Sequence, residues 1–331
     1  MPFQHSKIDL DFELDPEHIP DGFLRADVKV GNGRHIILAT DVQLDLLSRA
    51  KTWYVDGTFK VIKHPFVQLA SIHAFIRKDG NLKQEPLCYI VMSGRKTKDY
   101  NAVLRKIMEL LPERPVVRQI VSDFESVLWK SVVKVMAGVT HRGCSFHWAQ
   151  AVWRHLQLVH LQQDYMMVGK VYRFCRKIFA LPYLPQDSIV TVFEQLETRA
   201  ASTPKFVLLM DYIRSTWIDS TIWPPSAWSV YGQPVRTNND VEGWHYRLNR
   251  KAQRSGLNLY LLCRLLYEEA EMVEVNVRLL SDGKVRRMQR SKATKCQSKL
   301  HKYWQEYRDK ERTIDRLLTA CARLYGPRPD A

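Results

Sequence analysis

The amino-acid sequence predicts an α/β protein in which a mixed sheet core is interrupted by an all-helical insertion and followed by a helical C-terminal extension. Two observations predict it. Strand-like runs and amphipathic helices alternate over residues 53–144, whereas residues 146–217 show helical periodicity without a convincing strand. A chain of 331 residues is long enough for one large domain or two ordinary ones.

The first predicted elements form an antiparallel meander. Residues 1–52 are a lead-in segment, with a short amphipathic helix expected over residues 39–50. Three strands then follow over residues 53–61, 66–76 and 87–92. In the first strand, Val55 and Asp56 point to opposite faces because successive side chains alternate. Residues 78–81 are typical of a hairpin turn between the second and third strands.

Helices and strands alternate in the next part of the chain. Apolar residues recur at helical spacing over residues 100–111 and 125–137, and short strands are expected over residues 116–121 and 139–144. The resulting order, β-β-β-α-β-α-β, is that of a ribonuclease-H-like core. In that topology the fourth strand lies parallel to the first, about 4.8 Å away. We therefore expect Asp56 and Asp123 to face each other across the sheet.

Beyond the core the pattern is helical. Residues 217–234 are irregular, and helical signal resumes at Asn239, continues as an apolar helix over residues 258–281, and ends in a long basic helix over residues 284–325. We accordingly expect five parts: a lead-in (1–52), the first part of the core (53–150), a helical insertion (151–235), a core helix (236–256) and a basic helical extension (257–331).

The charge of the chain points to a polyanionic partner. Fifty Lys and Arg against 35 Asp and Glu give a net charge of +15, which favours association with nucleic acid over a generic basic surface. Residues 1–27 hold seven acids and two bases, whereas residues 284–312 hold eleven bases and three acids. The basic stretch is either a solvated helix face or a DNA-contacting arm.

Cysteine usage and hydropathy indicate a reducing intracellular environment. The six cysteines show no paired spacing and no disulfide framework. We see no signal peptide, and no apolar run reaches the roughly 18 residues expected of a membrane span. We expect neither a membrane nor a small-molecule substrate among the partners of this protein.

Three carboxylates are the candidate site residues, and each has a structural alternative. Asp56 lies in a strand but could belong to a turn with Gly57. Asp123 ends a strand but could cap the following helix. Glu242 follows Asn239 at the spacing of a capping box. Together they could bind Mg²⁺ or Mn²⁺, because these ions prefer oxygen ligands and substrate phosphate supplies the rest.

Five segments resemble the MULE (Mutator-like element) transposase domain: residues 53–60, 65–69, 122–125, 144–147 and 236–245. They occur in order and at approximately matching spacing, covering roughly residues 8–255. The resemblance implies a ribonuclease-H-like DDE core with a helical insertion between the second and third acids. It assigns Asp56, Asp123 and Glu242 as catalytic residues that bind two Mg²⁺ or Mn²⁺ ions, and it implies DNA as the substrate.

The leading functional hypothesis is therefore DNA transposition by metal-dependent cleavage and strand transfer, in the nucleus. The chain departs from the family in one respect, because nothing before Trp53 has the paired Cys/His spacing of an N-terminal DNA-binding module. This departure motivates the alternative of a domesticated, non-catalytic nuclear DNA-binding or regulatory protein. A host nuclease with the same fold is a third hypothesis.

Several further residues are candidates for DNA contact. His147 is a candidate by resemblance, although Cys144 and His147 are two ligands where structural zinc needs four, which favours ordinary packing. Basic residues also repeat at helical spacing after Glu242 and could bind phosphates, or could form a solvated face. These residues are Arg247, Arg250, Lys251 and Arg254.

Aromatic and apolar residues in the second half of the chain have two interpretations. Trp223, Trp228 and Trp244 could stack on unpaired bases, although core packing is the favoured role for most of them. Leu259, Leu262 and Leu266 belong to the core or to a self-association surface, so we also consider a homo-oligomer.

Overall fold

The structure is a computed structural model that describes residues 10–78, 81–201, 203–233, 239–281 and 291–327. The chain divides into two compact units. The first comprises the described residues up to His141 together with those from Asn239 to Ser281. The second comprises the described residues from Arg142 to Gln233 and from Ser291 onward.

Seven strands form one mixed sheet in the order β1-β2-β5-β4-β3-β6-β7. From β1 to β3 the neighbours pair antiparallel, whereas β3 and β6 pair parallel. β7 lies at the edge, where the chain passes from the first unit to the second. The strands are β1 (Leu24–Val30), β2 (Gly33–Leu38), β3 (Thr52–Thr58), β4 (Gln68–Lys78), β5 (Asn81–Met92), β6 (Gln119–Ser122) and β7 (Thr140–Gly143).

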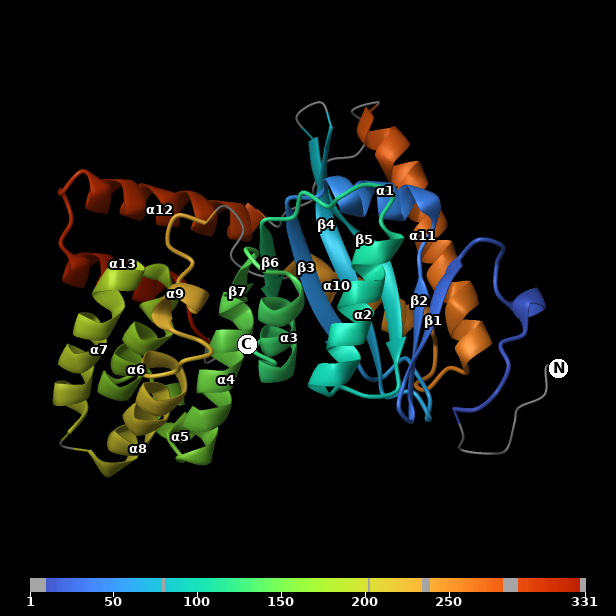
Figure 1. Ribbon diagram of the computed structural model, residues 1–331. Helices are drawn as coiled ribbons and strands as arrows, with labels where there is room; N and C mark the ends of the chain where they lie inside the picture. Colours follow the sequence, from blue (N-terminus) through green and yellow to red (C-terminus); the bar gives the residue numbers. More distant parts are fainter. Residues whose placement is uncertain (1–9, 79–80, 202, 234–238, 282–290, 328–331) are drawn as a thin grey trace. The chain divides into compact units, whose positions relative to one another are not determined.

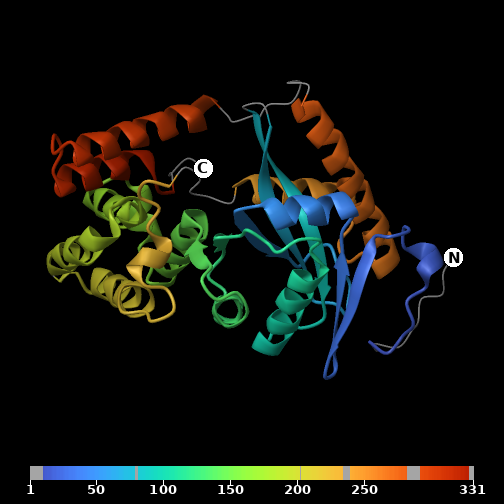
Figure 2. The same ribbon diagram turned by 45° about the horizontal axis from the view of Figure 1, so that its top comes forward.

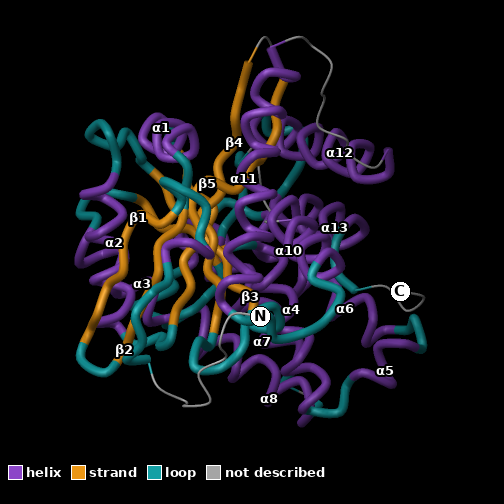
Figure 3. The backbone as a smooth tube through the Cα atoms, turned by 90° about the vertical axis from the view of Figure 1, so that its right-hand side faces the viewer, coloured by secondary structure: helices purple, strands orange, loops and turns teal. Residues whose placement is uncertain are grey.

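Helices cover both faces of this sheet. Figure 3 shows α2 (Thr97–Leu110) and α3 (Ser126–Val135) on one side, and α10 (Asn239–Lys251) and α11 (Leu259–Ser281) on the other. α1 (Asp41–Arg49) also belongs to this unit, and its Thr40 cap and Gln43 form a reciprocal capping box.

Side chains that alternate between the two faces of the central strands form two buried hydrophobic clusters, one on each face of the sheet. Ile90 packs with the α2 and α3 side, whereas its neighbour Tyr89 packs with the α10 and α11 side. This is the pattern expected where a strand is buried on both faces.

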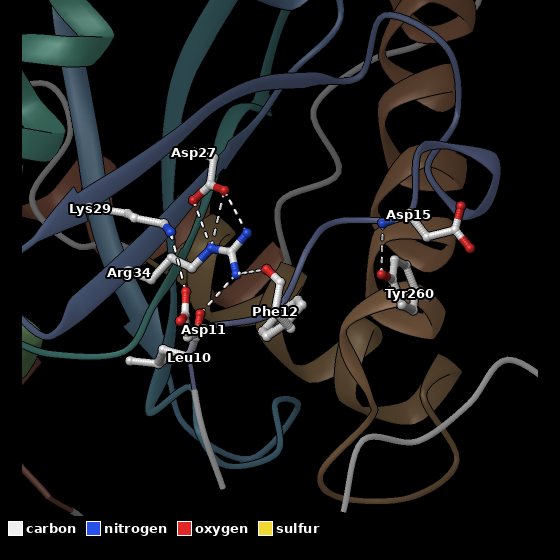
Figure 4. Close-up of polar contacts among 8 residues, drawn as sticks. All are labelled: Leu10, Asp11, Phe12, Asp15, Asp27, Lys29, Arg34 and Tyr260. Carbon is white, nitrogen blue, oxygen red and sulfur yellow. Dashed lines mark hydrogen bonds and ion pairs between the residues drawn. The ribbon is translucent and has the colours of Figure 1, made fainter. Parts of the chain in front are cut away.

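A buried arginine ties the N-terminal segment to the sheet (Figure 4). The guanidinium of Arg34, on β2, makes a bidentate ion pair with Asp27 on β1, with Nη2 to Oδ2 at 2.6 Å. Its Nη1 donates to the backbone carbonyls of Leu10 and Phe12, and the group lies 4.3 Å from the centre of the Phe12 ring. Side-chain exposure is 4% for Arg34 and 28% for Asp27, so this pair is largely removed from water.

A second contact holds the same segment against α11. The backbone N–H of Asp15 donates to the Tyr260 hydroxyl at 3.0 Å, and Tyr260 also contacts the ring of His18 in the short 3₁₀ helix η1 (Pro16–His18). Figure 2 shows this part of the chain beside one end of α11. The described part of the acidic lead-in, from Leu10 onward, is therefore folded onto the rest of the first unit.

The second unit is helical (Figure 1). Stacked Trp148 and Trp228 rings, with centroids 5.3 Å apart, lie in its core, and the buried Arg176 side chain of α6 donates to the Ala322 carbonyl of α13. Figures 1 and 2 both show α12 and α13 side by side. Its elements are α4 (Ser145–Leu158), α5 (Gln162–Met166), α6 (Lys170–Phe179), η2 (Leu181–Tyr183), α7 (Gln186–Ala200), α8 (Pro204–Ile213), η3 (Arg214–Ile218), α9 (Pro225–Trp228), α12 (Ser291–Arg308) and α13 (Ile314–Leu324).

The predicted α/β class and mixed sheet are confirmed. Two expectations about elements were wrong. The lead-in supplies strands β1 and β2, which were not predicted, although the alternation of apolar and charged residues in β1 is typical of a half-exposed strand. The long basic helix is two helices, because Lys310 adopts a left-handed conformation with φ of 61° and Thr313 caps a new helix.

Parts of some predictions lie outside the described residues. They include positions 79–80 of the expected hairpin turn, positions 236–238 of the Arg236 motif and positions 284–290 of the basic stretch. None of the helices in the described part of the chain combines the length and apolar character that crossing a bilayer requires.

Candidate metal-binding active site

The parallel pairing of β3 and β6 brings two of the predicted acids together. The last registered pair is Tyr54 with Val121, and Asp56 and Asp123 each come two residues later in their own strand direction. Asp56 remains within β3, opposite Ser71 of β4, so it does not belong to a turn. Its side chain is buried, and the Gly57 N–H donates to its Oδ1 at 2.9 Å.

Asp56 and Asp123 line one pocket of the first unit together with Glu125. The Tyr100 hydroxyl donates to Glu125 Oε2 at 2.8 Å and in turn accepts from Gln68 Nε2 at 2.8 Å. Burial raises the pKa of Glu125, the hydrogen bond from Tyr100 lowers it, and the carboxylate of Asp123 raises it again. The pocket is therefore lined by three carboxyl groups, and that of Glu125 is held by the hydrogen bond from Tyr100.

Asp123 does not cap the helix that follows it. The capping position of α3 is Glu125, two residues later, and its side chain makes no capping hydrogen bond to the helix. The backbone carbonyl of Asp123 accepts from Trp129 Nε1 at 2.8 Å and from Ser122 Oγ at 2.7 Å. These bonds fix the backbone at the end of β6, and the Asp123 side chain contributes to the pocket.

The third predicted acid lies in the first turn of α10. Asn239 is itself helical in α10, so it is not the cap, and the positions just before it lie outside the described residues. Glu242 instead groups with Asp56 and His245: one ligand atom from each lies within 4.8 Å of the other two. The Nδ1 atom of His245 is 3.7 Å from Asp56 Oδ2.

A buried polar chain continues from His245 to β4. Its Nε2 lies 3.3 Å from Ser71 Oγ, which lies 2.9 Å from His73 Nε2. Burial holds the pKa of His73 well below its usual value, and His245 and Arg247 lower it further. His73 is therefore neutral at physiological pH.

Glu269 of α11 fixes the position of α10. Its buried carboxylate accepts from Trp244 Nε1 at 2.8 Å and also binds Lys251 at the end of α10. The Trp244 ring is buried between Tyr89 and His73, at 5.8 and 5.0 Å between centroids. Trp244, between Glu242 and His245, and Lys251, after them, thus anchor α10 to the sheet and to α11.

The candidate DNA-contacting residues fall into three groups. Arg247 and Arg250 are exposed on α10, whereas Lys251 is engaged by Glu269. Arg254 lies beyond the end of α10, because Gln253 adopts a left-handed conformation with φ of 58°. His147 lies in the first turn of α4 in the second unit, after a fully buried Cys144.

The tryptophans and leucines considered above are mainly core residues. Trp228 and Trp244 are 0% and 2% exposed, which supports the packing interpretation over base stacking. Trp223 is half-buried. Leu259, Leu262 and Leu266 pack in the cluster on the α10 and α11 side of the sheet.

Sequence reasoning missed two residues of the site. Glu125 lies two residues after Asp123, and only the hydrogen bond from Tyr100, a long-range contact, distinguishes it from a helix-start acid. His245 lies three residues after Glu242, a spacing that places both on one helix face. That spacing was available in the sequence.

The donor set fits a divalent cation. Two carboxylates close together, one of them buried, are costly without a cation, since burial disfavours charge and like charges repel. Carboxylate oxygens are the ligands that Mg²⁺ and Mn²⁺ prefer. Asp56 and Glu242 are the carboxylates of this group that would hold such an ion, and Asp123 lines the neighbouring pocket with Asp56.

His141, which lies in β7 and contacts Ser122 at the end of β6, makes the first unit sensitive to acid. Its ring stacks on Trp129 at 3.8 Å, its Nε2 lies 2.8 Å from Ser122 Oγ, and burial lowers its pKa to about 3. Because this folded pKa lies below the unfolded value of about 6.5, the unfolded chain binds the proton first as the pH falls. The stabilisation is complete above about pH 6.5 and is lost progressively below it.

We expect the free energy of unfolding to fall by up to about 2 kcal/mol between pH 7 and pH 5 through this residue. Denaturant unfolding of the wild type and of His141→Gln across this pH range measures it. The variant should show a shallower acid dependence. Parallel pH profiles for the two proteins would contradict the assignment.

The family model of the MULE transposase domain matches residues 52–151, confirming the resemblance for that part of the chain. The matched segment includes Asp56 and Asp123 but not α10 with Glu242. The family implies DNA as a partner and generally uses divalent metal ions. No curated protein is found to match the chain.

Proposed function

We propose that this chain is a transposase-derived protein whose first unit has a ribonuclease-H-like core that cleaves DNA and transfers strands in a metal-dependent reaction. The observation that carries the proposal is the meeting of Asp56 with Asp123 from adjacent parallel strands and with Glu242 from a distant helix. The match of residues 52–151 to the MULE transposase domain supports it independently.

The residues of the site have distinct tasks in this reaction. Asp56 lines the pocket with Asp123 and also groups with Glu242, so it would be a ligand of both metal ions. Asp123 would be a further ligand of one ion, and Glu242 a further ligand of the other. When bound, the ions lower the pKa of the attacking water or 3′ hydroxyl and neutralise developing charge on the phosphate. Such a displacement depends on positioning rather than on a protein nucleophile.

DNA is the substrate that fits the charge of the protein. The net charge of +15 favours a polyanion, and Arg247 and Arg250 lie exposed one to two turns after Glu242 on the same helix. Contacts from these residues to phosphates would position the duplex without reading its sequence. We propose the nucleus as the place of action.

We expect the wild type to nick supercoiled plasmid DNA with Mn²⁺ and to lose this activity in excess EDTA. Glu242→Gln should lower the nicking rate by about 100-fold or more, because it removes a negative ligand from the ion that stabilises the transition state. Gel quantification of the nicked form over time measures both effects.

Glu271→Gln, the same change at an exposed position of α11, is the matched control and should cleave at the wild-type rate. Salt-sensitive DNA binding without any Mn²⁺-dependent nicking would contradict the proposed chemistry and support the non-catalytic DNA-binding alternative.

A further inference from the structure

His245 lies beside two of the candidate acids, Asp56 and Glu242, and the assignment of three catalytic acids gives this histidine no role. It follows Glu242 by three positions on α10, so both side chains project from one helix face. Its Nδ1 is 3.7 Å from Asp56 Oδ2, and one ligand atom from each of the three residues lies within 4.8 Å of the others. Ligands about 2.1 Å from one ion lie up to about 4.2 Å apart, so these spacings approach those of a shared coordination sphere.

The hydrogen-bond chain behind His245 suits a ring nitrogen that binds a metal ion. A ligating Nδ1 carries no hydrogen, so Nε2 must carry one and donate it to Ser71 Oγ. The Ser71 hydroxyl then donates to His73 Nε2, which must be an acceptor. His73 is buried and its Nε2 lies within hydrogen-bond distance of Ser71 Oγ, so it can fill that role. Every proton in the chain is thereby placed, with Ser71 and His73 orienting the ring as outer partners of a metal ligand do.

We propose that His245 is a nitrogen ligand of the metal ion held by Asp56 and Glu242, positioned by Ser71 and His73. The inference rests on the proposed function, because it adds a ligand to that site. Imidazole is a poor ligand for Mg²⁺ and a better one for transition metals. The centre therefore favours Mn²⁺ over Mg²⁺ more strongly than a site made of carboxylates alone.

Pulsed electron paramagnetic resonance of Mn²⁺ bound to the full-length protein tests the proposal without any turnover. We expect electron spin echo modulation from a directly coordinated ¹⁴N nucleus in the wild type. In protein grown with ¹⁵N-histidine, the modulation should change to the ¹⁵N frequency. This labelled sample needs no substitution, so it remains informative even if a variant fails to fold.

Substitution then identifies which histidine is responsible. His245→Gln should lose the nitrogen modulation, and its affinity for Mn²⁺ should fall about 10-fold or more while that for Mg²⁺ changes less. A residue that only stabilised the helix would weaken both ions equally. His18→Gln, at a half-exposed histidine in η1, is the matched control and should retain the wild-type spectrum.

The outcomes separate this proposal from the proposed function. A wild type that cleaves DNA with Mn²⁺ but shows no nitrogen coupling overturns the ligand assignment alone, leaving His245 as an ion-pair partner of Asp56. Nitrogen coupling that persists in His245→Gln overturns it as well. Nitrogen coupling that disappears in the variant, in a protein that never nicks DNA, supports the ligand and contradicts the cleavage function.

Discussion

Asp56→Asn is expected to lower metal-dependent strand cleavage by about 1,000-fold or more, the largest loss among single substitutions in the site. Asp56 lines the pocket shared with Asp123 and also groups with Glu242 and His245, so one substitution weakens both ion-binding positions. A factor of 1,000 corresponds to about 4 kcal/mol of transition-state stabilisation, within what metal-ion catalysis contributes. Single-turnover nicking rates at saturating Mn²⁺ measure the effect.

Thermal unfolding distinguishes loss of the site from loss of the fold. Because an ion that binds only the folded state stabilises it, Mn²⁺ should raise the Tm of the wild type. Asp56→Asn should unfold at or above the wild-type temperature without metal, since a buried charge has been removed, and should show little further rise with Mn²⁺. Asp21→Asn, at an exposed turn, should behave as wild type in both assays. A fully active Asp56→Asn would refute the site.

Asp27→Ala is expected to lower the free energy of unfolding by about 3 kcal/mol, the largest effect on stability that we predict. It leaves the Arg34 guanidinium buried without its carboxylate partner, and breaking a buried ion pair from one side costs about 3–5 kcal/mol. The carbonyls of Leu10 and Phe12 remain as acceptors, which places the loss at the lower end of that range. Denaturant titration monitored by circular dichroism measures it.

The neighbouring ion pair offers a matched comparison. Lys29 and Asp11 lie 3.6 Å apart in the same region, but their side chains are 63% and 86% exposed. Lys29→Ala should therefore cost less than about 1 kcal/mol. Asp27→Leu combined with Arg34→Met should recover part of the loss, because two apolar groups leave no buried charge. Equal losses of unfolding free energy in Asp27→Ala and Lys29→Ala would show that the burial of Arg34 does not determine how much the loss of its ion pair destabilises the protein.

Strongly periodic segments were the predictable part of the fold. The alternation around Asp56 and the helical repeat before Asp123 gave the element types and their order. The parallel pairing of β3 and β6 then followed from topology and is present in the structure. Strands β1 and β2 were missed for different reasons. Leu24–Val30 alternates between apolar and charged residues, a strand pattern that was overlooked, whereas the apolar part of β2 is a short run at residues 36–38, which periodicity alone does not assign.

The site was predictable where chain geometry alone positions a residue. Asp56 and Asp123 end up together because both stand two positions after a registered pair of parallel neighbours. Glu242 was ambiguous, since a first-turn acid suits a capping role as well as a metal ligand. Glu125 depends on Tyr100, which reaches it from another helix, and no local pattern in the sequence encodes such a contact.

The position of α10 in the chain has a consequence for synthesis. The two strand carboxylates can pair as soon as β6 has been made, but Glu242 is 119 positions later than Asp123 in the sequence. At roughly 5–20 residues per second, a ribosome needs on the order of 6–24 seconds to make that interval. Throughout that time the nascent protein carries an incomplete set of ligands. On the proposed function, cleavage competence would arise only when most of the polypeptide exists, which would build in a delay between the start of translation and the exposure of DNA to the complete centre.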